Sequence, residues 1–474
     1  MVFSSLTFLF FFLPLALLLY YSCPKRMKNI VLLAVSLFFY AWGEPIYIFL
    51  MIFSAGIDYV HGLIIHKNRM SRPSLANIAL LSSMVVNIAI LSFFKYADFL
   101  VENVNLLFGT AIMPLDLPLP IGISFYTFQT MSYSIDIYRG KVEPQKNPLT
   151  LALYVTLFPQ LIAGPIVRYE TIAKELSNRR FQLDQFAEGV RFFIVGLGKK
   201  VLIANSIGGL WFTIQGQELS DLSMLTVWLG IIAFSFQIYF DFSGYSDMAI
   251  GLGKMFGFNF PVNFNYPYIS KSVTEFWRRW HITLGSWFRD YVYFPLGGSR
   301  NGTWRTIRNL LIVWGITGLW HGASWNFVLW GLYFGFLIGI EKLGLLKLLE
   351  KMHPFFQHAY LLVIILFGWV LFVFDDLHKG VAYIKVMVGA TTNKLYDMQA
   401  LYFLYTHGVL LVIAVIASTP LLKHLKGKIK RAFPASFQRK AVELLSIGCL
   451  IILLVVSTAY LVNGSYNPFL YFRF

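Results

Sequence analysis

The sequence predicts an all-α, polytopic membrane protein with about 11 transmembrane helices, together with interfacial and broken helices. Of its 474 residues, 57% are hydrophobic and only 13% are charged, whereas soluble domains carry about 25% charged residues. Apolar stretches recur from one end of the chain to the other, and most can cross a ~30 Å hydrocarbon core at ~1.5 Å per residue. Basic residues cluster in the short connectors between these stretches, which is typical of cytoplasmic loops.

The first elements are a single span and a hairpin. We expect Ser5–Tyr21 to be a retained span and not a signal peptide, because no basic residue precedes it and no small-residue cleavage site follows it. Asn29–His66 is interrupted at Gly43-Glu44-Pro45, where glycine and proline end a helix. Basic clusters at 25–28 and 67–72 flank this hairpin, so its ends should be cytoplasmic and the N-terminus outside.

The remaining apolar segments complete the predicted bundle. They lie at about 75–94, 120–138, 149–167, 190–214, 222–257, 310–340, 357–375, 399–422 and 441–462. The segment 222–257 is long enough to contain more than one element, and Phe158–Pro165 is expected to be a broken helix because it holds two prolines. A third basic cluster, Lys423–Lys440, should face the cytoplasm. We find no repeat and no soluble domain, so residues 1–474 are treated as one integral-membrane domain.

Two segments differ from ordinary spans. Tyr169–Gly189 is polar and predicts a surface helix. Ser272–Tyr293 predicts one interfacial amphipathic helix, with Arg278 and Arg279 largely off its aromatic face. That face repeats at three- and four-residue spacing and includes Phe276, Trp277, Trp280, His281, Leu284, Trp287, Phe288 and Tyr291. His281 should therefore point inward.

His321 stands inside Leu310–Ile340, a run of 31 residues without Asp, Glu, Lys or Arg. An imidazole there must find a polar partner or line a wet cavity, because lipid offers no hydrogen bond. Its ordinary pKa of ~6.5 suits proton transfer, although a hydrogen bond between helices is the simpler alternative. Gly315, Gly318 and Gly322 flank His321 and permit a close helix contact or a break in the helix. Four nearby tryptophans are candidates for a cavity wall: Trp314, Trp320, Trp325 and Trp330.

Asp241 and Asp247 are two carboxylates in an apolar stretch. Six residues separate them, which places them about 120° apart on an ideal helix and argues against a paired acid and base. Ser243-Gly244 is expected to interrupt the helix. We therefore favour a structural role, in which each carboxylate binds freed backbone or an arginine.

Other functional classes lack their signatures. The sequence has no glycine-rich phosphate loop, no zinc-ligand spacing and no nucleophile elbow. Cys23 and Cys449 have no metal-type spacing either, so no metal is expected. The net charge of +16 is explained by basic cytoplasmic loops. No nucleic-acid partner is therefore expected.

Several motifs together resemble the membrane-bound O-acyltransferase family, and most closely its bacterial branch that acetylates polysaccharides such as alginate. The motifs are Ser124–Gln129, Ile162–Pro165, Asp241–Ala249, Glu275–Ile282 and Leu319–Gly322. The opening Met1–Ser5 and the closing Asn467–Phe472 also fit that branch. The resemblance is densest over 120–335, and 341–460 carries no motif that we can place.

The resemblance implies a fold around a central tunnel, in which an acyl group passes from a cytosolic thioester to a hydroxyl. His321 matches the family's catalytic histidine and His281 its second signature position. His321 would act as the base, and His281 or Asn326 would supply hydrogen bonds to the oxyanion. Five residues would line or support the cavity: Asp241, Asp247, Tyr245, Trp280 and Trp320. The cationic residues Arg278, Arg279, Lys199 and Lys200 would hold the phosphates of coenzyme A, although topology alone predicts the same charges.

The resemblance also implies partners and a location. Acetyl-CoA is expected as co-substrate, with no permanently bound cofactor. An exported polysaccharide would be the final acceptor, reached through an extracytoplasmic serine-type acetyltransferase, and the protein would lie among the lipids of the bacterial cytoplasmic (inner) membrane. Two alternatives remain open at this point. One is D-alanyl transfer toward teichoic acids, and the other is a transporter or flippase, which would usually show inverted repeats.

Overall fold

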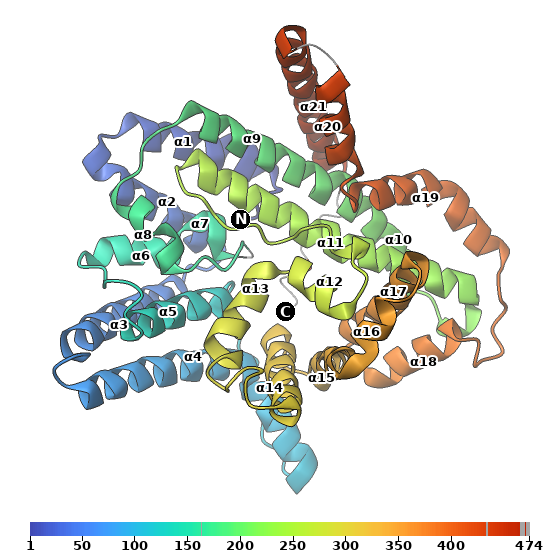
Figure 1. Cartoon of the computed structure of the whole chain (residues 1–474), viewed down its shortest axis with the longest axis horizontal. Helices are drawn as coiled ribbons and strands as arrows, with labels where there is room; N and C mark the ends of the chain where they lie inside the picture. The colour runs from blue at the N-terminus through green and yellow to red at the C-terminus, as the bar shows by residue number, and fades with distance from the viewer. Residues whose placement is uncertain (163, 433–434, 465–469, 471–474) are drawn as a thin grey trace. The chain divides into compact units, whose positions relative to one another are not determined.

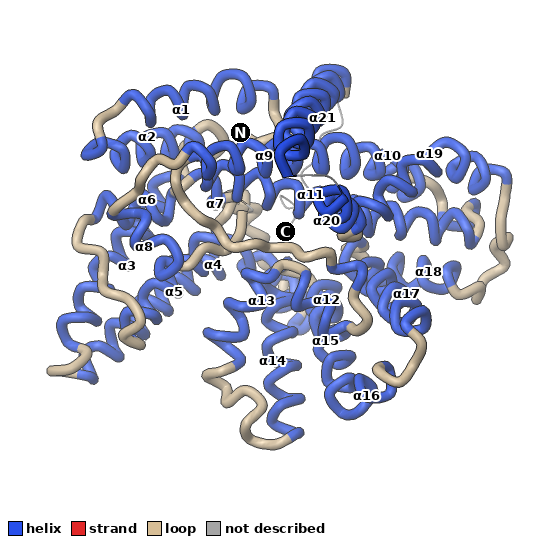
Figure 2. Tube along the Cα trace, turned by 45° about the horizontal axis from the view of Figure 1, so that its top comes forward, coloured by secondary structure: helices blue, strands red, loops and turns tan. Residues whose placement is uncertain are grey.

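The computed structural model describes residues 1–162, 164–432, 435–464 and 470, and this part of the chain is helical without strands (Figures 1 and 2). The closing motif Asn467–Phe472, apart from Leu470, and Ala163 lie outside the described residues. The chain divides into two compact units that interleave in sequence. One contains Met1–Phe193 and Tyr245–Pro261, and the other contains Ile194–Gly244 and Val262–Phe474.

The first unit holds the expected N-terminal spans. Its helices are α1 (Leu13–Ser22), α2 (Lys28–Ala41), α3 (Ile48–Asn68), α4 (Pro73–Phe108), α5 (Ile123–Tyr138), α6 (Pro148–Thr156), α7 (Phe158–Leu161) and α8 (Tyr169–Ser177). A π-helical turn, Phe8–Phe12, leads into α1. The predicted hairpin is present as α2 and α3, and the predicted break near Phe158 is present between α6 and α7. The surface helix is shorter than expected, because α8 ends at Ser177 and α9 (Leu183–Gly198) takes up the later residues.

A buried polar network joins α3, α4 and α5. Asp58 is fully buried, and its carboxylate accepts hydrogen bonds from Ser83, from Ser134 at 3.0 Å and from the amide of Asn87 at 2.7 Å. The Asn87 oxygen accepts from Thr130 at 3.1 Å. The polar side chains of this network thereby satisfy one another, which favours one rotation of α5 against the other two helices.

The second unit carries both candidate histidines. After α9 and a π-helical turn, Lys199–Asn205, its helices are α10 (Ser206–Gln215), α11 (Met224–Met255), α12 (Val273–Arg279), α13 (Ile282–Phe288), α14 (Thr303–His321), α15 (Trp325–Ile340), α16 (Leu346–Leu349), α17 (Pro354–Val373), α18 (Leu377–Met387), α19 (Met398–Ala417), α20 (Leu421–Ala432) and α21 (Ala435–Asn463). Further π-helical turns cover Arg289–Tyr293 and Glu341–Leu345.

The helix α11 is continuous, so the predicted interruption at Ser243-Gly244 is wrong. The glycine is used for packing instead. A Cβ on Gly244 would lie 2.7 Å from the carbonyl oxygen of Gly196 and 3.0 Å from the amide nitrogen of Lys200. The two backbones therefore approach more closely than any larger residue would allow.

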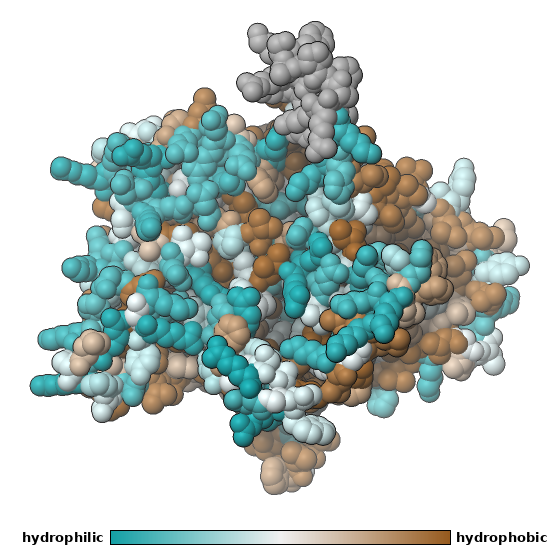
Figure 3. Space-filling view, in the orientation of Figure 1, coloured by the Kyte–Doolittle hydropathy of each residue, from teal (hydrophilic) through white to brown (hydrophobic). Residues whose placement is uncertain are grey.

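Seven helices in the described residues are long and apolar enough to cross a membrane: Ile48–Asn68, Pro73–Phe108, Leu183–Gln215, Met224–Met255, Pro354–Val373, Met398–Ala417 and Leu444–Asn463. The other predicted segments form shorter helices, such as α1 and α2, or broken ones. Apolar side chains of α19 are widely exposed, among them Val409 (76%) and Val412 (59%), and Figure 3 shows hydrophobic surface where α19 lies. The chain is a multi-pass membrane protein of all-α class.

Candidate active site

The charge-free run 310–340 folds as a helical hairpin and not as one span. α14 ends at His321, Gly322 is extended (φ −165°, ψ 153°), and α15 begins at Trp325. His321 therefore lies at the closed end of the hairpin. The helix break that glycine was expected to permit is located at Gly322.

Two other glycines let the hairpin close tightly. A Cβ on Gly318 would lie 2.2 Å from the carbonyl oxygen of Phe327, and a Cβ on Gly331 would lie 2.2 Å from that of Trp314. Figures 1 and 2 show α14 and α15 side by side. The predicted close approach at Gly318 is confirmed, and it holds the backbone that carries His321 against α15.

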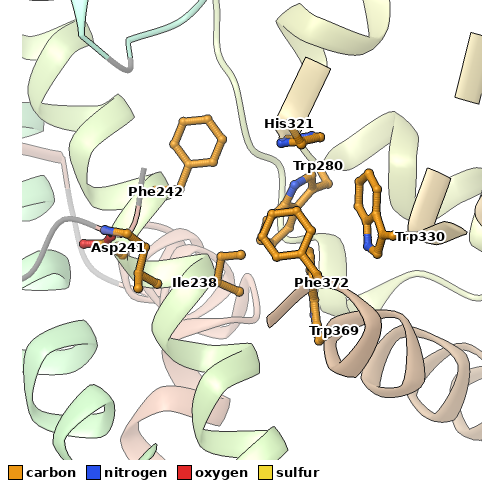
Figure 4. A pocket seen from close by; sticks show the side chains of 9 residues that line it. Ile238, Asp241, Phe242, Trp280, His321, Trp330, Trp369 and Phe372 are labelled. Atoms are coloured by element: carbon orange, nitrogen blue, oxygen red, sulfur yellow. The ribbon is translucent and has the colours of Figure 1, made fainter. Parts of the chain in front are cut away.

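Aromatic rings enclose the imidazole of His321, which is 6% exposed. Its ring centroid lies 4.9 Å from that of Trp320, 5.0 Å from Trp330 and 5.5 Å from Phe372, each in an edge-to-face arrangement. The ring lines a small cavity of about 20 Å³ (Figure 4). The cavity is bounded by Ile238, Asp241, Phe242, Trp280, His321, Trp330, Trp369, Phe372 and Leu470.

His281 lies between two short helices, so the prediction of one continuous helix over Ser272–Tyr293 is wrong. α12 ends at Arg279, and His281 adopts a left-handed conformation (φ 43°, ψ 52°) before α13 begins. Few residues other than glycine adopt this conformation, and strain of this kind concentrates at functional sites. The turn brings the buried His281 ring within 6.1 Å of the Trp320 ring, between centroids.

Asn263 sets the tautomer of His281. Its Oδ1 accepts from the backbone N–H of Thr283 at 3.2 Å and from the Thr283 hydroxyl at 2.9 Å, which identifies this atom as oxygen. The same oxygen lies 3.2 Å from Nδ1 of His281, so Nδ1 must donate and carry the proton. Burial lowers the pKa of His281 to about 3, so the ring is neutral and Nε2 holds a lone pair. This geometry favours proton acceptance at Nε2 over the expected donation to an oxyanion.

A larger cavity of about 550 Å³ is lined by both histidines. One face of α14 forms a wall along its length: Leu310, Val313, Trp314, Thr317 and His321. The other lining residues include His281, Trp280 and the cationic side chains Arg278, Arg289 and Lys342. His321 and Trp280 line both cavities. The structure thus brings together the two histidines that the sequence singled out, while their catalytic roles stay predictions.

The four cations expected to hold coenzyme A are placed differently from one another. Arg278 is exposed and lines the large cavity, as expected. Arg279 is paired with Glu275 at 2.9 Å and donates to the backbone oxygen of Asn265, and it does not line the cavity. Lys199 is half-buried and also lies off both cavities.

Lys200 does not lie where the prediction of a phosphate contact requires it. Its side chain is 2% exposed and its ammonium lies 2.5 Å from the carboxylate of Asp241, so it is not presented at a surface where it could hold a phosphate. The other carboxylate oxygen of Asp241 accepts from the backbone N–H of Leu470 at 3.0 Å. Asp241 therefore joins three segments at the small cavity, in the structural role that was expected, with a lysine in place of the expected arginine.

The other predicted residues support the site or lie apart from it. Trp320 packs against both imidazoles. Asn326 is buried, donates to the backbone oxygen of Leu371 at 3.5 Å and lines neither cavity. Tyr245 and Asp247 belong to the first unit and do not occur among the described residues that line the two cavities. Tyr245 stacks on Phe3 at 4.5 Å between centroids, which gives the opening motif a packing role.

Sequence reasoning missed several supporting residues. Asn263 lies in a loop with no periodic pattern, and Trp369 and Phe372 lie in the segment without motifs. Glu341 was also missed, although it is 1% exposed and its carboxylate accepts from the backbone N–H groups of Val273 (2.7 Å) and Thr274 (2.8 Å). A carboxylate at the first turn of a helix offsets the dipole and the unpaired donors there. The sequence did contain a signal for Glu341, because this lone Glu directly follows a 31-residue run without charge.

The chain is similar to known proteins over most of its length. The model of the membrane-bound O-acyltransferase family matches residues 145–374. The probable alginate O-acetylase AlgI of Pseudomonas putida is 38% identical over 503 residues, covering 100% of both chains. The peptidoglycan O-acetyltransferase of Helicobacter pylori is 35% identical over 427 residues, covering 82% of this chain and 80% of its own. The teichoic acid D-alanyltransferase of Bacillus subtilis is 30% identical over 234 residues, covering 46% and 58%.

Proposed function

Because the chain belongs to the membrane-bound O-acyltransferase family, we propose that this enzyme takes an acetyl group from cytosolic acetyl-CoA and passes it across the bacterial inner membrane toward an exported polysaccharide. The names of its relatives support this proposal, since those that match over most of the chain are named for O-acetylation of alginate or peptidoglycan. Family membership also makes the chain an O-acyltransferase enzyme, which leaves no support for the transporter alternative.

The observation that carries the proposal is a cavity that runs along α14 from a cationic end to His321. Lys342 and Leu310 line one end and His321 lines the other. Eleven residues separate Leu310 from His321, which corresponds to about 16 Å of helix. A donor that holds its acyl group on a long flexible arm, with phosphates at the far end, fits this shape and charge. We assign the phosphate contacts to Arg278 and Lys342, since the third cation that lines the cavity, Arg289, is paired with Asp290 at 2.8 Å.

The chemistry follows from the residues at the closed end. His321 takes the proton of an acceptor hydroxyl as its oxygen attacks the acyl carbon. The new C–O bond forms, the C–S bond of the thioester breaks, and the thiolate leaves through the large cavity and gains a proton. The indole N–H of Trp330 is buried beside His321 and has no hydrogen-bond partner among the described residues. It is the donor best placed to stabilise the oxyanion.

In this proposal, the acceptor hydroxyl reaches His321 from the side of the small cavity. His321 lines this space as well as the large one, so a hydroxyl arriving through it would meet the base without crossing the thioester cavity. We assign this hydroxyl to the serine of an extracytoplasmic acetyltransferase, which then passes the acetyl group to the polysaccharide. D-alanyl transfer is the second candidate, supported by a relative that matches less than half of this chain.

The test is the transfer of labelled acetyl from acetyl-CoA, by the purified protein in vesicles, to its extracytoplasmic acetyltransferase partner enclosed in those vesicles. Substituting His321→Ala should lower the rate by at least roughly 100-fold, because general-base catalysis contributes about 10² to 10⁴. Substituting the exposed His378→Ala, which lies off both cavities, should leave it unchanged. Near-wild-type transfer by the His321 variant would refute the assignment. If the protein is active only with a carrier protein that holds D-alanine as a thioester, D-alanyl transfer is the function and acetyl-CoA is not the donor.

A further inference from the structure

The first unit contains a separate small pocket that the acyl transfer does not use. It lies where the end of α1, the start of α2, the segment between α8 and α9, and the end of α11 meet. The lining residues are Tyr20, Tyr21, Lys28, Arg179, Arg180, Phe181, Gln182, Gln185, Lys254, Phe256 and Gly257. Four of them are cationic and none is acidic, so the pocket has a strong positive potential.

Most of this positive charge has no acidic partner. Lys254 is paired with Glu188 at 2.9 Å. For Lys28, Arg179 and Arg180, the described residues include no carboxylate within 4.0 Å. Bringing like charges together around one cavity is unfavourable unless an anion lies between them. Three cations without an acidic partner around one pocket therefore point to an anionic ligand.

Two of the cations, Arg179 and Lys28, are held by contacts within the pocket. The guanidinium of Arg179 donates to the hydroxyl of Tyr20 at 3.1 Å, to the backbone oxygen of Glu175 at 3.0 Å and to the side-chain oxygen of Asn29 at 2.5 Å. The ammonium of Lys28 lies 4.6 Å from the ring centroid of Tyr20. Both cations are therefore held in place before any ligand arrives, which reduces the entropy lost on binding.

Membrane topology alone does not account for this arrangement. Lys25 and Arg26 belong to the same connector and carry the same charge, yet they are exposed and do not line the pocket. A positive-inside bias requires only that cations lie on one side, as these two do. Lys28 and Arg180 differ because they converge on a cavity. Figure 3 shows hydrophilic side chains over the region where α1 and α9 lie, and Phe181 beside them is 59% exposed, as is common at a lipid interface.

We propose that this basic pocket binds a phosphate group, carried either by the headgroup of an anionic phospholipid or by a soluble phosphate compound. Guanidinium and ammonium donors are the side chains that recognise phosphate. Basic pockets between membrane helices on the cytoplasmic side bind phospholipid headgroups by the same contacts. The proposal concerns the first unit only and does not depend on the catalytic assignment.

The test measures thermal unfolding of the full-length protein in neutral detergent at fixed salt. Three probes are titrated separately: short-chain phosphatidylglycerol, phosphatidylcholine of the same chain length, and inorganic pyrophosphate. A ligand that binds only the folded state raises Tm with its concentration. The pocket variant is Lys28→Gln with Arg180→Gln, and the matched control is Lys25→Gln with Arg26→Gln. Both remove two positive charges from the same side of the first unit.

Phosphatidylglycerol should raise Tm of the wild type and of the control. Its apparent Kd should weaken roughly 10- to 30-fold in the pocket variant, since each cation near an anionic surface contributes about a tenfold factor or less. If pyrophosphate shows these changes in Tm and apparent Kd and phosphatidylglycerol does not, the ligand is a soluble phosphate compound. Equal responses of the two double variants, or no response of the wild type to either anion, would overturn the proposal. If the pocket variant fails to fold, the exposed Arg180→Gln alone carries the comparison.

Discussion

At the scale of single residues, His321 and His281 differ in what holds them. Edge-to-face contacts with Trp330 and Phe372 hold the His321 ring. His281 donates from Nδ1 to Asn263, packs edge-to-face on Phe242 at 4.7 Å between ring centroids, and has a left-handed backbone conformation with φ of 43°. The cost of that conformation, of order 1–3 kcal/mol, must be offset by the contacts around it. Asn263 therefore acts as a positioning residue for His281.

Substituting Asn263→Ala should lower acetyl transfer about 10-fold, because it removes the acceptor that fixes the ring and its tautomer. Asn263→Asp keeps the acceptor but adds a carboxylate, which raises the pKa of His281 from about 3. The ring then becomes charged at a higher pH than in the wild type. The acid limb of the pH–rate profile should consequently move to higher pH in this variant.

The control is Thr283→Val, which removes the hydroxyl that binds Asn263 and leaves the bond to His281. It should retain most activity and the wild-type pH profile. If Asn263→Asp lowers activity equally at every pH, the residue has only a structural role.

At the scale of elements, glycine sets the distance between α14 and α15. Along α14, an added Cβ would meet very different surroundings at two neighbouring glycines. At Gly318 it would lie 2.2 Å from the backbone oxygen of Phe327, whereas at Gly315 the nearest atom is a side-chain methyl of Leu332 at 3.7 Å. A flexible side chain yields at little cost, while backbone yields only if the helices separate.

Gly318→Ala should therefore destabilise the protein by about 1–3 kcal/mol and lower activity, because it displaces the turn that ends at His321. Gly315→Ala should be neutral or stabilising, since alanine favours helix over glycine by about 1 kcal/mol. Thermal unfolding in detergent compares the two variants. Equal Tm values for both would contradict the close packing of the hairpin.

At the scale of the whole molecule, the sequence predicted the class of fold and the two histidines because both leave local signals. Long apolar runs predict spans, and a histidine inside such a run is conspicuous. The broken turn at His281 was not predictable, because its helical periodicity continues across the break. The continuity of α11 was missed for the opposite reason, since Gly244 serves a close contact with Gly196 and not an interruption. The partners Lys200 and Asp241 depend on tertiary contact alone.

The expected orientation can be tested by cysteine labelling in a variant with both native cysteines replaced by serine. Lys67→Cys and Lys428→Cys should react with an impermeant maleimide only after the cells are opened, because Lys/Arg-rich connectors remain cytoplasmic. Met113→Cys is the control. It follows α4, is 85% exposed, and should react in intact cells. Labelling of both lysine positions from outside would reverse the orientation.

The hairpin of α14 and α15 also bears on how the chain enters the membrane during synthesis. The start of α14 and the end of α15 lie beside each other at the open end, since Gly339 faces Ile307 there. The flanks of that open end are both basic: Arg300, Arg305 and Arg308 before it, and Lys342, Lys347 and Lys351 after it. A single span would force one of these flanks through the bilayer, at about 2.5–3.5 kcal/mol for each Lys or Arg at its centre. A hairpin inserts with its charge-free closed end leading, so the translocation machinery need not carry any of these six charges across.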